Sequence, residues 1–129
     1  DDTTYTVLAA DSGKMHIMPD FTASCTLALP AAAAGLEYEF IGKGVAADAH
    51  HWIFQSASAT NFYLGGVGFL DTDDPADTVV AVYSNGSSND FLTVNAPGAG
   101  TRIYLVCDGT NWIANGIVVG ATAPAFSDT

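Results

Sequence analysis

Acidic side chains crowd into one short segment, DTDDPAD, which supplies Asp71, Asp73, Asp74 and Asp77. Oxygen ligands at this density are the kind that Ca²⁺ prefers in proteins. The segment departs from the EF-hand pattern, because Pro75 stands where a third ligand would be and neither a glycine nor a closing glutamate follows. We therefore predict a solvated acidic turn. A cation held at a junction between subunits is the alternative, and no cofactor is expected.

Histidine and cysteine offer little further chemistry. His50 and His51 are adjacent, so in a strand they would point to opposite faces and could not both bind one metal ion. Cys25 and Cys107 lack the spacing of zinc ligands and fall on the apolar faces of expected strands. We predict two buried thiols rather than a disulfide. With no convergent set of nucleophile, base or paired carboxylates in the sequence, we expect that the protein is not an enzyme.

Aromatic side chains could bind a sugar, because their rings stack on the flat apolar faces of pyranoses. The candidates are Trp52, Tyr63, Tyr83, Tyr104 and Trp112. An aromatic residue in a strand more often packs in the core or against a neighbouring strand, and we favour that interpretation.

The composition favours association with other proteins. Only 13% of the 129 residues are charged, whereas 49% are hydrophobic, and the net charge is -11. Short side chains and few charges lower the cost of covering a surface. The negative charge disfavours nucleic acid and anionic membranes as partners, and no stretch reaches the length of a membrane span. The rare cations Lys43 and Arg102, with Trp52, are possible interface residues, although ordinary surface charge also accounts for the two cations.

Alternation of apolar and polar residues with a period of two recurs along the chain, and no window has a helical repeat. This pattern predicts about nine strands among ten candidate segments: 4–9, 14–18, 23–29, 36–41, 50–55, 61–69, 78–84, 90–95, 101–107 and 111–119. Segment 61–69 is interrupted by glycines and should be irregular.

Turn residues suggest how these strands connect. Asn85-Gly86 predicts a hairpin between 78–84 and 90–95, and Asp108-Gly109 predicts another between 101–107 and 111–119. Many short strands in one domain, residues 1–129, predict an all-β sandwich with a jelly-roll or related Greek-key topology. Residues 121–129 are expected to form a C-terminal arm.

Three stretches carry a resemblance to a known group of proteins. YTVLAADSGKMHIM and CTLALPAAAAGLEYEFIGKG resemble the opening, and RIYLVCDGTNWIANG the closing hairpin, of small β-sandwich proteins of tailed-bacteriophage virions. These include head decoration (cement) proteins and modules of tail appendages. The similarity covers the N-terminal third and the last quarter of the chain, and the middle, with its acidic loop, is not matched. The resemblance implies a homotrimeric sandwich on the virion exterior with no catalytic residues.

These observations lead to a functional expectation. We expect a capsid decoration protein that binds copies of itself and the major capsid protein on the outside of a phage head, and that binds neither nucleic acid nor membrane. One alternative is a tail-fibre or receptor-binding module that grips a host glycan. Another is a carbohydrate-binding module of cellular origin.

Overall fold

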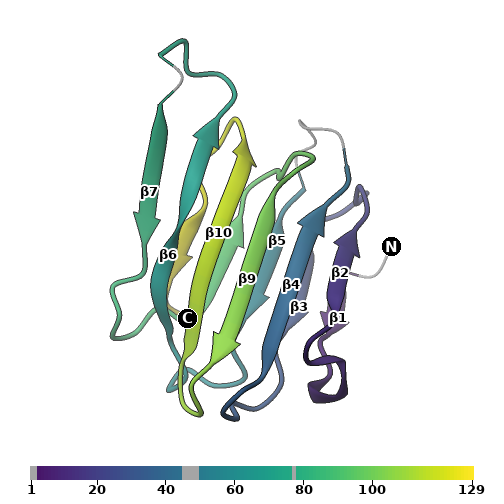
Figure 1. Ribbon diagram of the computed structural model, residues 1–129, viewed down its shortest axis with the longest axis vertical. Helices are drawn as coiled ribbons and strands as arrows, with labels where there is room; N and C mark the ends of the chain where they lie inside the picture. The colour runs from purple at the N-terminus through teal and green to yellow at the C-terminus, as the bar shows by residue number, and fades with distance from the viewer. Residues whose placement is uncertain (1–2, 45–49, 77) are drawn as a thin grey trace.

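The computed structural model describes residues 3–44, 50–76 and 78–129, which form eleven strands and one short 3₁₀ helix, Ala9–Asp11. The front sheet in Figure 1 has the order β2 (Met15–Met18), β4 (Glu37–Gly42), β9 (Arg102–Cys107), β10 (Trp112–Gly120), β6 (Tyr63–Asp71) and β7 (Val79–Tyr83). The back sheet has the order β1 (Thr4–Thr6), β3 (Cys25–Ala28), β5 (Trp52–Gln55), β8 (Phe91–Val94) and β11 (Ala125–Ser127). Within these residues, no helix has the length and apolar character needed to span a membrane.

The two sheets pack face to face, which confirms the predicted all-β sandwich. In β4, Tyr38 and Phe40 are buried between the sheets, whereas Glu37 is exposed and Glu39 is half-buried. The rings of Phe40 in the front sheet and Phe54 in the back sheet meet edge to face, with centroids 4.8 Å apart. Alternation with a period of two therefore places one face of each sheet in a shared apolar core.

The strand pairing is more mixed than in a jelly roll, whose strands are antiparallel. From β1 to β6, successive strands alternate between the back and front sheets. A chain that crosses over after each strand returns to the same sheet in the same direction. Consequently β1, β3 and β5 are mutually parallel, as are β2 and β4.

Of the two predicted hairpins, one is confirmed and one is wrong. β9 and β10 pair as antiparallel neighbours on either side of Asp108-Gly109. β7 and β8, however, lie in different sheets, so Asn85-Gly86 does not close a hairpin. The side-chain oxygen of Asn85 instead accepts the backbone N–H groups of Ser87 and Ser88, both at 3.0 Å. This turn carries the chain from one sheet to the other, because β7 pairs with β6 and β8 pairs with β5 and β11.

The expected C-terminal arm is also a wrong prediction. Residues 125–127 form β11 and pair with β8 at the edge of the back sheet. The last residues then meet buried polar groups: the side-chain amide of Asn89 donates to Asp128 at 2.6 Å, and the Thr129 N–H donates to Asp90 at 2.8 Å. Buried polar groups require partners, so the C-terminal segment completes the sandwich.

Both cysteines are buried thiols, as predicted, and they form no disulfide. Cys25 belongs to β3 in the back sheet and Cys107 to β9 in the front sheet. Each is an apolar core position and behaves as a small hydrophobic residue.

Candidate interaction surface

The outward side of the front sheet carries large apolar side chains over three neighbouring strands. We name the outer apolar face by its five most prominent residues, whose exposed fractions run from 37% for Leu70 to 73% for Tyr83: Leu70, Val79, Tyr83, Ile113 and Ile117. The strands that supply them, β10, β6 and β7, are adjacent in the sheet. Exposed apolar areas of this kind mark interaction sites more often than scattered single residues do.

The strand register makes the outer apolar face continuous. Ile117 lies beside Gly68, which lies beside Ala81 on β7. A Cβ atom added at Gly68 would lie 3.7 Å from Val79 and 3.8 Å from Ile117, so both flank this glycine. No outward position of β10, β6 or β7 carries a charge. The face is therefore uncharged and mainly apolar.

A polar strip borders this face on β4 and β9. The hydroxyl of Tyr104 donates a hydrogen bond of 2.7 Å to Glu37, and this bond raises the pKa of Tyr104. Arg102 forms an ion pair with Glu39 on the neighbouring strand. The charge predicted to mark an intersubunit contact is thus paired within the chain.

The other predicted interface residues fall in two different environments. Lys43 is exposed directly after β4, and its backbone N–H donates to the Met18 carbonyl at 3.1 Å. Trp52 is only 3% exposed. The prediction of Trp52 as an interface residue is therefore wrong, because its ring belongs to the core between the sheets.

The aromatic residues do not form a stacking platform among the described residues. Trp52, Tyr63 and Trp112 are buried, as the core interpretation predicted. Tyr83 and Tyr104 reach the surface, but they lie on β7 and β9, with β6 and β10 between these strands.

Two carboxylates of the acidic segment accept hydrogen bonds from within it or from the residue just after it. Asp71 accepts the N–H of Asp73 at 2.9 Å, and Asp74 accepts the N–H of Ala76 at 2.9 Å as well as the hydroxyl of Thr78. These hydrogen bonds, led by that of Thr78, lower the pKa of Asp74. Asp77 lies outside the described residues. Within the described part, no three or more His, Cys, Asp or Glu side chains gather into a group that could hold a metal ion.

Two of the histidines have separate structural contacts. His16 in β2 stacks on Phe40, with ring centroids 4.7 Å apart. The Nδ1 atom of His51 accepts the backbone N–H of Ala96 at 3.2 Å. Neither contact joins a histidine to a nucleophile or to a carboxylate.

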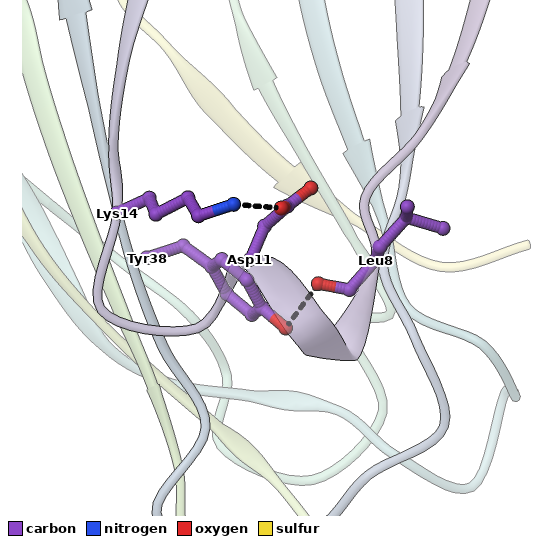
Figure 2. Close-up of polar contacts among 4 residues, drawn as sticks. All are labelled: Leu8, Asp11, Lys14 and Tyr38. Carbon is purple, nitrogen blue, oxygen red and sulfur yellow. Dashed lines mark hydrogen bonds and ion pairs between the residues drawn. The ribbon is translucent and has the colours of Figure 1, made fainter.

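The segment ADSGK, which carried part of the resemblance, builds a turn against β4. The ammonium group of Lys14 donates to Asp11 at 2.7 Å, and the hydroxyl of Tyr38 donates to the Leu8 carbonyl at 3.1 Å (Figure 2). Gly13 has φ of 84°, a left-handed conformation that glycine adopts without strain. These contacts give the motif a role in the fold.

The segment DGTNW has the same structural character. Asp108 accepts the backbone N–H groups of Asn111 at 2.7 Å and Thr110 at 2.8 Å, and these bonds lower the pKa of its carboxyl. Trp112, which follows, is fully buried and lies 5.9 Å from the ring of Tyr38. The two motifs of the resemblance thus converge on Tyr38.

A cleft of about 370 Å³ opens beside β1 and β2, at the opposite end of the front sheet from β7. Its walls include Tyr5, His16, Met18, Phe21, Cys25 and Leu27. The walls are mainly apolar, and Cys25 itself is only 2% exposed.

Comparison of the chain with protein-family models, with curated proteins and with solved structures found no match.

Sequence reasoning did not single out the outer apolar face. The signal was present in VVAVY, residues 79–83, where both alternating sets of positions are apolar. Such a run is typical of a strand covered on both faces. In this chain the run forms β7, an exposed strand at the edge of the front sheet. A strand that is apolar on both faces but exposed to solvent is the feature that identifies the outer apolar face.

Proposed function

We propose that this chain is a structural protein of a tailed-phage virion that decorates the outside of the head and stabilises the shell. The phage assignment and the three-copy assembly rest on the resemblance of the N-terminal third and the last quarter of the sequence to such proteins. The outer apolar face is the observation that supports a role in assembly, because it offers uncharged side chains for burial against another subunit.

The physical case rests on the cost of association. A stable interface buries about 800 Å² on each partner. Covering the outer apolar face requires no charged group of β10, β6 or β7 to lose its water, and valine and isoleucine lose little rotamer freedom when buried. The adjoining pair of Arg102 and Glu39 keeps its charges satisfied at the border of that contact.

The proposed mechanism is thermodynamic linkage. A protein that binds only the assembled shell stabilises that shell by mass action, and three linked copies strengthen the effect through multivalency. This activity needs surface complementarity and no catalytic group.

The test is binding to heads purified from the virus that encodes the chain. Intact heads stripped of the protein should regain it from solution and should then resist heat or chelation better than bare heads. Ile113→Lys places a charge in the outer apolar face and should weaken head binding at least tenfold. The matched control is Thr122→Lys, which adds the same charge at an exposed loop position outside this face.

Two outcomes would overturn the proposal. One is the absence of the chain from purified heads together with its presence in tails. The other is binding to a glycan array without binding to heads, which would favour a receptor-binding or carbohydrate-binding module.

A further inference from the structure

Among the described residues, no strand pairs with the outer backbone edge of β7. It is the last strand of the front sheet, and β6 is its neighbour on one side only. The N–H of Ser84, just after β7, donates to the Gly65 carbonyl at 3.0 Å. Backbone groups point alternately to the two sides of an antiparallel strand. The groups that point toward the free edge are therefore those of Val79, Ala81 and Tyr83.

This edge lacks the usual protection against pairing. Natural sheets blunt their edges with very short strands, charged side chains or proline. The edge strands β1 and β11 have three residues each, and β2 directly follows Lys14. β7 has five residues, VVAVY, with neither a charge nor a proline.

The outer face of β7 is open, and its inner face is open in part, because Val82 packs against the core. Val79 and Tyr83 project on the outer side, and Val80, on the opposite side, is 48% exposed. In Figure 1, β7 forms the left edge of the front sheet. A strand added here would find apolar side chains above and below its backbone.

We propose that β7 of one copy pairs with β7 of a second copy, antiparallel, about a two-fold axis at Ala81. In this register Ala81 faces Ala81 of the second copy, and Val79 faces Tyr83 of the second copy. The free N–H and C=O groups of these residues then bond to one another, and the two front sheets join into one.

The distribution of charge favours a second copy in this orientation. Asp71 ends β6 and Asp73 and Asp74 follow in the loop before β7, whereas residues 84–88 after β7 carry no charge. Antiparallel pairing places each acidic loop beside the uncharged turn of the other copy. Parallel pairing would bring the two acidic loops together in a chain of net charge -11.

This contact goes beyond the proposed function and does not depend on it. The two-fold contact uses the edge of β7, so the remainder of the outer apolar face stays available to another subunit. In a shell built from three-copy units, the contact would join copies that belong to neighbouring units.

Disulfide trapping tests the register. An antiparallel pair that exchanges hydrogen bonds has Cα atoms about 5.5 Å apart, within the range that a disulfide bridges. Under mild oxidation, Ala81→Cys should form a covalent dimer at least ten times faster than the control Ser87→Cys, which lies on the exposed turn after β7. The native cysteines are buried and should contribute little cross-linking.

Charge exchange tests the two-fold axis. Ala81→Lys and Ala81→Asp should each weaken self-association at least tenfold, because like charges then face one another across the axis. An equimolar mixture of the two variants should associate again, as measured by sedimentation velocity. Circular dichroism of each variant checks that the exposed substitution leaves the sandwich folded.

Equal cross-linking rates for Ala81→Cys and Ser87→Cys would overturn the proposal. A mixture of the Lys and Asp variants that associates no better than either alone would also overturn it. Both assays use the purified chain without heads, so failure of the chain to bind heads would leave their results unchanged.

Discussion

The hydroxyl of Tyr63 in β6 donates a hydrogen bond of 3.2 Å to the backbone carbonyl of Phe54 in β5, and this bond joins the two sheets inside the core. Tyr63 is fully buried, and its ring also lies 5.8 Å from that of Phe126 in β11. One side chain therefore connects three strands across the sandwich.

Replacement of Tyr63 should show how much the hydrogen bond to Phe54 contributes to the free energy of unfolding. Tyr63→Phe keeps the ring but removes the donor, so we expect a loss of about 1–2 kcal/mol in the free energy of unfolding at pH 8. Urea unfolding followed by fluorescence measures this difference. Tyr83→Phe, at a position that is 73% exposed, is the control and should change stability very little.

The same residue predicts a decline in stability at alkaline pH. Burial raises the pKa of Tyr63 well above its ordinary value of 10.0. Its contribution to stability is therefore complete below about pH 10 and falls as the pH rises further, because the unfolded chain ionises the phenol and the folded chain does not. Unfolding free energies at pH 9 and pH 11 should differ less in Tyr63→Phe than in the wild type. An identical difference in the two proteins would contradict this expectation.

Gly116 in β10 should tolerate replacement by alanine less well than Gly68 in β6. Its φ is 135°, and a Cβ atom added there would lie 2.0 Å from the carbonyl oxygen of Arg102. We expect Gly116→Ala to destabilise the protein by about 2–4 kcal/mol. Gly68→Ala is the matched control, since its added Cβ would make only ordinary contacts at 3.7 Å or more. Thermal unfolding of the two variants under one condition gives the comparison.

The turn at Asp108 predicts sensitivity to acid. The hydrogen bonds from Asn111 and Thr110 lower the pKa of Asp108 below its ordinary value of 3.8. The ionised carboxyl thus stabilises the fold above about pH 4, and this stabilisation is lost as the pH falls through the lowered pKa. Asp108→Asn should show a smaller fall in melting temperature between about pH 5 and pH 2 than the wild type does. Equal falls would show that the turn does not depend on the charge.

The two thiols should be slow to react in the folded protein. Cys25 is 2% exposed and Cys107 is 1% exposed, so a thiol reagent should label both only on unfolding. We expect a reducing agent to leave the melting temperature unchanged, because no disulfide links the sheets. Rapid labelling of Cys25 in the native protein would show that the cleft beside β1 and β2 opens to its sulfur.

Sequence reasoning located the strands well where one face is buried and the other is polar. In β4, the alternation of glutamate with Tyr38 and Phe40 shows which face of the strand is buried. The turn residues Asp108-Gly109 indicate that β9 and β10 form a hairpin. Such signals lie within a few residues of one another, so a single sequence contains them in full.

The pairing of distant strands could not be predicted in the same way. Asn85-Gly86 has the composition of a hairpin turn, but β7 pairs with β6 and not with β8. This pairing depends on apolar contacts with residues outside the local segment. The C-terminal strand was missed because AFS is short and its partner, residues 91–93 of β8, lies far away in sequence. The outer apolar face is a property of the assembled sheet, since three separate segments contribute to it.

The alternation of β1 to β6 between the two sheets has a consequence for how the chain folds. Between any two strands of this part of the chain that pair within one sheet, the chain first forms a strand of the other sheet. Ordering one sheet therefore requires closing loops that pass through the other, which slows folding and makes it cooperative. A ribosome would have to release β2 and β4 along with β1, β3 and β5 before those three strands of the back sheet could pair.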